Sequence, residues 1–233
     1  MRLAQILFTQ GFGSRRECVG RVLAGEVTID GTAHDDPDED LPTEGLVFTV
    51  AGRDWPFRAK ALIVLHKPTG YECSMKPRHH PSVMSLLPLP LRVRGLQPVG
   101  RLDEDTTGLL LLTDDGALIH RLTSPKHKVP KVYEVTARHP VDARQLQALV
   151  DGVVLDDDPA PARALAAETD ADGKLLRLTL AEGRYHQVKR MVAAVGNRCD
   201  SLHRSRFGAL ALPADLAPGQ WRWCAPEDIT PPA

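Results

Sequence analysis

The feature that most constrains the fold is the uninterrupted run Leu109 to Leu112, within the segment GRLDEDTTGLLLLTDDG of residues 100–116. A short continuous apolar run bounded by turn-forming residues is typical of a strand that is buried on both faces. Such a strand needs a covering layer on each side, so we expect it inside a substantial core. A chain of 233 residues can form that core and a second, smaller domain.

The composition is that of an ordinary globular protein. Hydrophobic residues make up 42% of the chain and charged residues 25%, without the bias of disordered or fibrous sequences. The four cysteines are far apart and form no Cys-x-x-Cys pair, which argues against a metal site and against a disulfide scaffold. No apolar run has the length of a membrane span, so we expect a cytoplasmic protein.

The net charge of −1 hides an uneven distribution. Residues 1–57 contain 5 Lys/Arg and 10 Asp/Glu, whereas the rest of the chain contains 24 and 20. The larger part also contains basic clusters, such as the one at 76–80 and the pair Arg92 and Arg94, that are suited to phosphate groups. The alternative is that these clusters are solvated loops.

Residues 1–57 are predicted to form a small domain of two helices followed by strands. An apolar pattern of helical period begins at Leu3 and ends at the glycines of GFG at 11–13. SRRE at 14–17 is a capping box that starts a second helix. The Asp30-Gly31 pair after EVTI predicts a hairpin turn.

The second helix is predicted to be amphipathic. Val19, Val22 and Leu23 are expected to face inward, which leaves its guanidinium groups free to contact RNA phosphates. The arginines concerned are Arg15, Arg16 and Arg21.

The segment SRRECVGRVLAGEVTIDG, residues 14–31, resembles the small RNA-binding domain shared by a small-subunit ribosomal protein, tyrosyl-tRNA synthetases and several rRNA-modifying enzymes. The acidic loop DDPDED at 35–40 departs from a uniformly basic module, so we expect RNA contacts from the arginine helix alone. A linker is expected at 58–62, followed by a larger domain at 63–233.

The larger domain is predicted to be α+β, with a mixed, mostly antiparallel sheet flanked by helices, because its strands and helices alternate without regular spacing. The proline-rich stretch from Met75 to Pro98 is expected to be a surface loop with a short turn at 83–87. A helix is expected to begin at TDDG and to stop at Ser124-Pro125. Further strands are expected at Val132–Thr136, Leu175–Leu180 and Leu202–Leu212.

The acids around the leucine run have different expected roles. Asp114 and Asp115 are placed to cap the following helix. Asp103 lies in the loop before the strand, where a carboxylate can face a cleft while the strand fixes its backbone. The alternative is a solvated acidic turn.

EGRYHQVKRMVAAVGN, residues 182–197, predicts an amphipathic helix with Lys189 beside its apolar stripe. A partly covered ammonium is costly unless a carboxylate pairs with it. A pair between Asp103 and Lys189 would meet that need and hold Asp103 ionised in a pocket that excludes water. The alternative is a surface lysine that extends into solvent.

Several segments together resemble the signature of pseudouridine synthases of the RsuA family. They are GRLDEDTTGLLLLTDDG at 100–116, KVYEV at 131–135, EGRYHQVKRM at 182–191 and LHRSRFG at 202–208. GYECS at 70–74 points to the branch that acts on small-subunit rRNA.

The resemblance implies a role for individual residues. Asp103 matches the catalytic aspartate, and Arg101 the neighbouring arginine that enters the space left by the flipped base. Tyr133 matches the tyrosine that stacks on the target ring; its alternative is a core aromatic. Lys189 matches the basic residue that pairs with the aspartate, and Leu202 the apolar residue beneath the base.

Arg184 also fits the motif, with a structural role at the helix start as the alternative. The residues expected to contact RNA are therefore Arg101, Leu202, Arg184, Arg15, Arg16, Arg21 and Arg78.

The family's reaction cleaves the bond from ribose to the ring nitrogen of uridine, turns the detached ring and rejoins it through carbon, so no atom is gained or lost. We therefore expect no cofactor and no metal. The aspartate either bonds to the sugar or removes a sugar proton, and the sequence favours neither route.

The resemblance implies that the partner is 16S rRNA, in a partly assembled small subunit, and that the protein acts as a monomer. The alternatives are a large-subunit (23S) rRNA synthase of the same family, a non-catalytic RNA-binding or ribosome assembly protein, and a nucleoside-type hydrolase.

Overall fold

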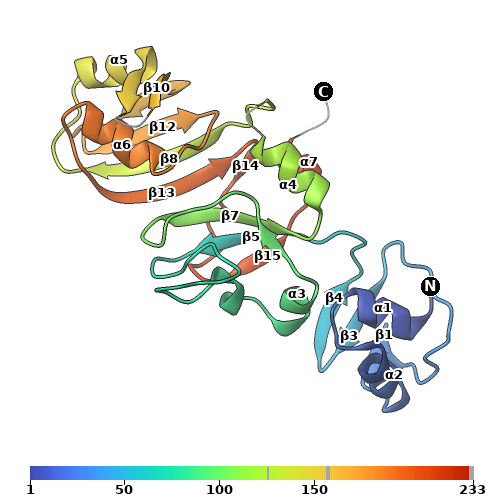
Figure 1. The fold of residues 1–233 in the computed structure, drawn as a ribbon. Coiled ribbons are helices and arrows are strands. Elements are labelled where there is room, and N and C mark those ends of the chain that lie inside the picture. Colours follow the sequence, from blue (N-terminus) through green and yellow to red (C-terminus); the bar gives the residue numbers. More distant parts are fainter. Residues whose placement is uncertain (125, 156–157, 231–233) are drawn as a thin grey trace. The chain divides into compact units, whose positions relative to one another are not determined.

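The computed structural model describes residues 1–124, 126–155 and 158–230 (Figure 1). By packing, it divides into two units, one of residues 1–61 and 87–97 and the other of residues 62–86 and 98 onward. The domains expected from the sequence, residues 1–57 and 63–233 joined by a linker at 58–62, stay a prediction. Packing adds that the segment 87–97 groups with the first unit.

The first unit has two helices and a four-stranded sheet of order β2-β1-β3-β4. Its elements are α1 (Leu3–Thr9), α2 (Arg15–Leu23), β1 (Val27–Ile29), β2 (Thr32–Ala33), β3 (Val47–Val50) and β4 (Arg53–Pro56), with α3 (Leu89–Val93) from the later segment. The predicted capping box is present, because Ser14 Oγ accepts from the Glu17 amide and the Glu17 carboxylate accepts from the Ser14 amide. Asp30 and Gly31 have φ of 50° and 78°, as the predicted hairpin turn requires.

The predicted inner face of α2 is partly wrong. Cys18 and Val22 are fully buried, whereas Val19 is 36% and Leu23 63% exposed. Residues four apart lie on one stripe of a helix, and the stripe through 18 and 22 is the one that is covered. The stripe through 19 and 23 is rotated by about 100° from it and stays at the surface, because α2 packs on one side only.

The stretch from Met75 to Pro98 is not a surface loop throughout. It contains a 3₁₀ helix, η1 (Val83–Leu86), and α3, and it buries Leu87 and Leu91. Proline is tolerated before and within a first helical turn, where its missing N–H has no partner to lose. The prolines of this stretch therefore begin a helix.

Arg94, which follows α3, is held within the first unit. It donates to Gln10 Oε1 at 2.6 Å and to the Arg58 carbonyl at 2.9 Å. Gln10 is 1% exposed and itself bonds the Arg58 backbone in both directions. The expectation that Arg94 is available for phosphate is therefore corrected, because its guanidinium serves an internal network.

The second unit is built on a mixed sheet of order β11-β12-β8-β13-β7-β5-β15. Along this path in the described residues, β7 and β13 run parallel and the other neighbours antiparallel. This confirms the predicted α+β fold. The strands are β5 (Leu62–Lys67), β6 (Gln97–Pro98), β7 (Thr107–Thr113), β8 (Lys131–Ala137), β9 (Val153–Leu155), β10 (Asp158–Ala162), β11 (Ala166–Thr169), β12 (Leu175–Leu180), β13 (Cys199–Phe207), β14 (Leu210–Ala211) and β15 (Trp221–Trp223).

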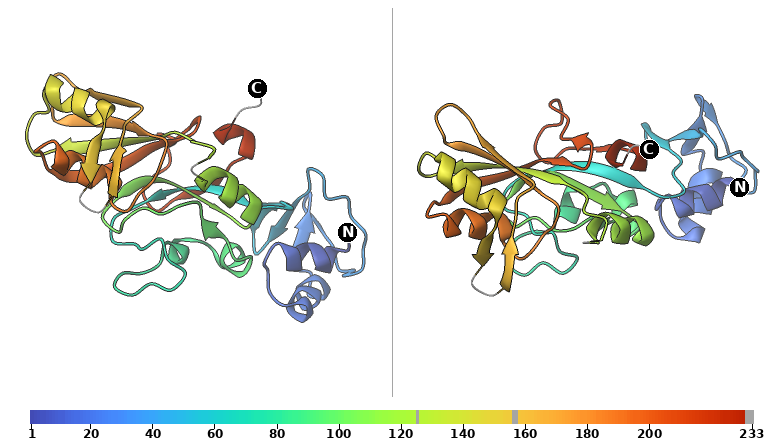
Figure 2. Two further views of the ribbon diagram at one scale, coloured as in Figure 1. Left: turned by 45° about the horizontal axis from the view of Figure 1, so that its top comes forward. Right: turned by 90° about the horizontal axis from the view of Figure 1, so that it is seen from above.

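Helices flank this sheet at two places (Figures 1 and 2). α5 (Ala143–Asp151), α6 (Gln187–Ala194) and the paired strands β9 and β10 gather at the end that carries β11 and β12. α4 (Gly116–Thr123) and α7 (Pro226–Ile229) cover Leu109 and Leu111 of β7 in the main core cluster. None of the helices in the described ranges has the length and apolar character needed to cross a bilayer.

The leucine run forms the centre of β7, and each of its four residues is fully buried. The predicted cap of the next helix is confirmed for Asp115, whose Oδ1 accepts from the amides of Ala117 and Leu118 at 2.9 and 3.2 Å. Ser124 is the C-cap of α4, and Pro125 lies outside the described residues. β7 therefore connects the acidic loop that precedes it to the capped helix α4 that follows it.

Candidate active site

A cavity of about 880 Å³ lies on one face of the second unit's sheet. Its border includes the loop 100–106, the loop 182–186 before α6, the start of α6, and the strands β8 and β13. The predicted site residues that line it are Arg78, Arg101, Asp103, Tyr133, Arg184, Lys189 and Leu202. The structure thus brings together the residues predicted from four separate motifs.

The ion pair predicted between Asp103 and Lys189 is present. Lys189 Nζ lies 3.1 Å from Asp103 Oδ2, and its side chain is 26% exposed, so the ammonium is partly covered as expected. The Asp103 side chain is 32% exposed. The expectation of a pocket that excludes water is therefore not met in the free protein, where the carboxylate is still open to solvent.

Lys189 also holds a second carboxylate, which the motifs did not indicate. Its Nζ donates to Asp105 Oδ1 at 2.6 Å and to Oδ2 at 2.9 Å. Burial opposes ionisation of Asp105, but the hydrogen bond and charge of Lys189 outweigh it and lower the pKa of that carboxyl. Burial likewise opposes the charge of Lys189, and the two carboxylates outweigh it and raise the ammonium pKa. Lys189 is therefore charged throughout the physiological range.

His186 contacts the other oxygen of Asp103, with Nε2 3.3 Å from Oδ1. It precedes α6 in a left-handed conformation, φ 48° and ψ 32°, which costs energy in a residue with a side chain. Its ring stacks on that of Tyr185 with centroids 3.8 Å apart, and Tyr185 is 74% exposed. Each carboxylate oxygen of Asp103 thus lies close to a side-chain nitrogen, one from Lys189 and one from His186. The strained backbone at His186 positions the second of these.

A buried lysine fixes the loop that carries Asp103. Lys67 at the end of β5 is fully buried, and its Nζ donates to the carbonyls of Pro68, Glu104 and Thr106 at 3.0, 3.0 and 2.8 Å. Burial lowers its pKa, and the nearby acidic groups oppose that shift. The ammonium ties the backbone on both sides of Asp105 to the sheet.

Gly108, the second residue of β7, permits the parallel pairing beside this loop. It has φ of +106°, and a Cβ added there would collide with the backbone of Arg204 on β13. Only glycine adopts that backbone at so close an approach without strain. The glycine of the TTGLLLL motif is thus explained by the contact between β7 and β13.

Glu72 of the GYECS motif organises another edge of the cavity. Its carboxylate accepts from the backbone amides of Arg78, His79 and His80 at 3.1, 2.8 and 3.0 Å. The bonds from His79 and His80 come first among the causes that lower the Glu72 pKa to about 2. The side chains of all three donors line the cavity.

Strand alternation builds the covered wall of the cavity. Tyr133 and Leu202 are 8% and 7% exposed, and Arg204 and Phe207 are more deeply buried. Residues two apart on a strand share a face, so Lys131 lies on the same side of β8 as Tyr133. Tyr133 is therefore both a buried aromatic and a wall of the cavity.

Not every predicted RNA contact has a free side chain. Arg184 donates to the Ala160 carbonyl at 2.6 Å and contacts Glu182 at 3.3 Å. In α2, Arg15 donates to Gln5 at 2.8 Å and Arg21 forms an ion pair with Glu26 at 2.6 Å. Arg16 is exposed.

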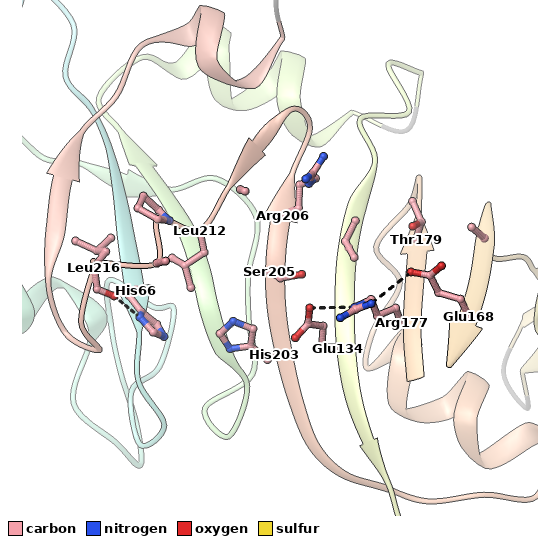
Figure 3. A pocket seen from close by; sticks show the side chains of 15 residues that line it. His66, Glu134, Glu168, Arg177, Thr179, His203, Ser205, Arg206, Leu212 and Leu216 are labelled. Atoms are coloured by element: carbon pink, nitrogen blue, oxygen red, sulfur yellow. Dashed lines mark hydrogen bonds and ion pairs between the residues drawn. The ribbon is translucent and has the colours of Figure 1, made fainter. Parts of the chain in front are cut away.

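A second hollow, of about 590 Å³, lies on the opposite face of the same sheet (Figure 3). It is lined by the residues of β8, β12 and β13 that alternate along each strand with those facing the Asp103 cavity. Glu134 and Glu168 both form ion pairs with Arg177, at 3.4 and 3.8 Å. Burial lowers the pKa of His203, and the neighbouring His66 lowers it further. Its acids are neutralised within the hollow, so the cavity that contains Asp103 is the better candidate for chemistry.

The Asp103 cavity suits one type of reaction. A glycoside hydrolase needs two working carboxylates. The acids other than Asp103 that line this cavity are engaged: Asp105 pairs with Lys189, Glu182 with Arg184 and Glu104 with His80, and Glu72 accepts from three backbone amides. A carboxylate in a cavity lined by a tyrosine can attack a sugar, or remove a proton from it, while the tyrosine stacks on a flat ring.

Comparisons with known proteins agree with this assignment. The family model described as RNA pseudouridylate synthase matches residues 61–194. The ribosomal small subunit pseudouridine synthase A of Yersinia pestis is 41% identical over 98% of this chain and 97% of its own length. The protein of the same name from Escherichia coli K12 is 40% identical over 98% of each.

A crystal structure of a pseudouridylate synthase covers 98% of this chain and 98% of its own, with 33% identity and a TM-score of 0.68. An uncharacterized RNA pseudouridine synthase of Bacillus subtilis is 38% identical over 98% of this chain. The resemblance inferred from the motifs is confirmed, and this chain belongs to the RNA pseudouridine synthase family, in its RsuA-like group.

Proposed function

We propose that this protein isomerises one uridine of 16S rRNA to pseudouridine without a cofactor. The observation that carries the proposal is the Asp103 carboxylate, with Lys189 on one oxygen and His186 on the other, in a cavity walled by Tyr133. The small-subunit assignment rests on the near full-length relatives named for that ribosomal subunit.

In this reaction the target nucleotide must first leave its stack, at a cost of about a few kcal/mol. Tyr133 replaces part of the lost stacking, which is worth roughly 1–3 kcal/mol per base at single-stranded sites. Arg101, exposed at the rim of the cavity, enters the space that the base vacates. Leu202 supports the base from the covered wall.

Asp103 then acts on the ribose, either by bonding to C1′ or by removing a proton from C2′. Lys189 pairs with the Asp103 carboxylate and orients it, and Asp105 stabilises the charge of Lys189. The bound RNA completes the exclusion of water that the free protein lacks, which protects the detached ring from loss.

RNA outside the cavity is held by exposed cations. Arg78 contacts phosphates near the cavity, and Arg16 does so from α2, whereas Arg15 and Arg21 also serve the internal contacts described above. Arg184 acts mainly as a structural link before α6. We expect the protein to act as a cytoplasmic monomer on a partly assembled small subunit.

The test is a pseudouridine map of rRNA by carbodiimide treatment and primer extension. Cells that lack this gene should lose one signal in 16S rRNA, and the wild-type gene should restore it. The Asp172→Asn gene, altered in an exposed turn, should restore it too. An unchanged map contradicts the proposal, and a lost signal in 23S rRNA supports a large-subunit synthase.

A nucleoside-type hydrolase and a non-catalytic assembly protein predict different results. The hydrolase would release free uracil from RNA. The assembly protein would give the same map with Asp103→Asn as with the wild type.

A further inference from the structure

Two more cations, the half-buried Lys131 and the buried Arg204, line the Asp103 cavity in addition to Lys189. Lys131 on β8 and Arg204 on β13 both line it, and Arg204 is only 2% exposed. The Lys131 Nζ and the Arg204 Cζ lie 5.1 and 5.2 Å from the centroid of the Phe207 ring. The two positive charges are therefore gathered over one aromatic side chain.

Neither cation forms an ion pair with a carboxylate in the described part of the chain. Lys131 Nζ donates to the Val129 carbonyl at 3.0 Å, and Arg204 Nε to the Leu109 carbonyl at 2.8 Å. Arg204 Nη2 is buried and has no hydrogen-bond partner among residues 1–124, 126–155 and 158–230. Burial, with a further contribution from Arg204, lowers the pKa of Lys131 to about 8.

Buried like charges without a counter-ion destabilise a protein. Positive charges that line a reaction cavity can stabilise negative charge that develops on the substrate during the reaction. Lys131 and Arg204 both line the cavity, so the negative charge that suits them is that of a group bound there.

We propose that Lys131 and Arg204 stabilise the uracil ring while it is detached from the ribose, by receiving the negative charge that the ring then carries. This inference rests on the proposed function. It assigns to Lys131 a catalytic role that is separate from the Asp103–Lys189 pair.

The chemistry requires such a charge by either route. When Asp103 bonds to C1′, or when it removes the C2′ proton and a C1′–C2′ double bond forms, the C1′–N1 bond breaks and its electron pair passes to the ring. The charge spreads over N1, O2 and O4. The ring then turns, and C5 bonds to C1′ as the carboxylate leaves or C2′ regains its proton. C5 loses a proton and N1 gains one, so the atoms balance.

A ring suits this wall better than a phosphate does. Arg204 and Phe207 are buried beside Tyr133, and a phosphodiester that reached them would lose most of its hydration. A flat ring enters against Tyr133 and presents carbonyl oxygens at its edge. Phosphates instead meet exposed cations such as Arg78 and Arg101.

The test compares variants of Lys131 in a single-turnover assay on a 16S rRNA fragment, with RNA affinity measured separately. Lys131→Met keeps the stem over Phe207 and removes the charge, Lys131→Gln is a second charge-free variant, and Lys131→Arg keeps the charge. Lys174→Met, at an exposed lysine, is the matched control. Thermal melting verifies that each variant is folded.

We expect both charge-free variants to slow the single-turnover step by about 10- to 100-fold. We expect RNA affinity to change by less than about twofold, and Lys131→Arg to retain most of the rate. A phosphate contact would instead weaken RNA binding, with an altered salt dependence and an unchanged rate of the bound complex. That result, or wild-type rates in the folded charge-free variants, overturns the inference.

A second substrate tests the charge itself. RNA with 5-fluorouridine at the target position releases a ring whose anion is more stable, because fluorine withdraws electrons. The defect of Lys131→Met, measured as consumption of the fluorinated nucleoside, should then be smaller than with uridine; an equal defect contradicts the inference. A wild-type protein that forms no pseudouridine contradicts the proposed function instead.

Discussion

At the scale of single residues, the site is defined by how Lys189 is shared. Its ammonium lies 3.1 Å from the Asp103 carboxylate and 2.6 Å from the Asp105 carboxylate. The shorter contact is with Asp105, to which the family resemblance assigns no role. Asp105 therefore anchors the lysine, while Asp103 remains accessible to a substrate.

Asp105→Asn should accordingly weaken the reaction without abolishing it. The amide removes one of two negative charges from Lys189 but leaves its contact with Asp103, so we expect kcat to fall by about 3- to 10-fold, or about 1 kcal/mol. Steady-state kinetics on a 16S rRNA fragment measure this, with Asp172→Asn as the control. A loss as complete as that of Asp103→Asn would mean that the two acids act as a unit.

The Lys131 charge should appear in the pH dependence. The pKa of Lys131 is lowered from its ordinary 10.5 to about 8, so the ammonium is present below that pH and is lost as the pH rises through it. Burial is the main cause of the shift and the charge of Arg204 adds to it, while the Phe207 ring and the Val129 carbonyl complete the contacts of Lys131. We expect the single-turnover rate to fall above about pH 8 in the wild type.

In Lys131→Arg this alkaline decline should shift to higher pH, because a guanidinium stays charged. The comparison of the two pH profiles separates Lys131 from groups of the RNA that titrate in the same range. An identical decline in both proteins would assign it to another group.

The residue-scale predictions that held have a simple origin. A lysine beside an apolar helical stripe needs a counter-ion, which makes Lys189 a candidate, and the resemblance to the family motif then decides in favour of its pairing with Asp103. His186 fits the motif, but its contact with Asp103 and the contact of Asp105 with Lys189 depend on how a loop and a strained turn approach α6, which the sequence does not show. Signals were present, since Asp105 is two residues from Asp103 and Lys131 alternates with Tyr133.

At the scale of elements, the meeting of β7 and β13 determines the site. β7 carries the loop with Asp103 at its start, and β13 carries Leu202 and Arg204. Their parallel pairing at Thr107–His203 and Gly108–Arg204 brings the two motifs together.

Gly108→Ala should therefore disrupt both folding and activity. The added Cβ collides with the Arg204 backbone and the backbone is left-handed, so we expect a loss of about 3 kcal/mol or more of unfolding free energy. Urea denaturation measures the loss. Gly116→Ala is the control, because a Cβ there meets nothing within 4 Å, and equal stabilities of the two variants would contradict this account.

The elements show where sequence patterns fail. The leucine strand, the capped helices and the strand β12 were predicted correctly, because burial period and caps are local signals. The proline-rich composition argues against a helix and so does not predict α3, whose prolines stand before it and in its first turn. The exposed Val19 and Leu23 show that an apolar pattern does not reveal which of two adjacent stripes is covered.

At the scale of the whole molecule, the first unit is assembled from two separate pieces of chain. Residues 87–97 complete it, and Arg94 ties them to Gln10 and Arg58. Long-range grouping of this kind depends on packing between distant segments, so the composition change near residue 57 gave no sign of it.

Arg94→Ala should destabilise the first unit in particular. Gln10, 1% exposed, would lose its charged partner, at a cost of about 2 kcal/mol. Hydrogen exchange of α1 and α3 amides should become faster, while amides of β7 in the second unit stay protected. Arg92→Ala, on the exposed side of α3, is the control; equal exchange in the two variants would show that the Arg94 network is unimportant.

The central claim is that the Asp103 carboxylate isomerises uridine, and the most direct measurement is nucleoside analysis of 16S rRNA incubated with purified protein. We predict one new pseudouridine and no free uracil with the wild type, and neither with Asp103→Asn, although that variant still binds the RNA. Pseudouridine formed by Asp103→Asn, or uracil released by the wild type, would contradict the account.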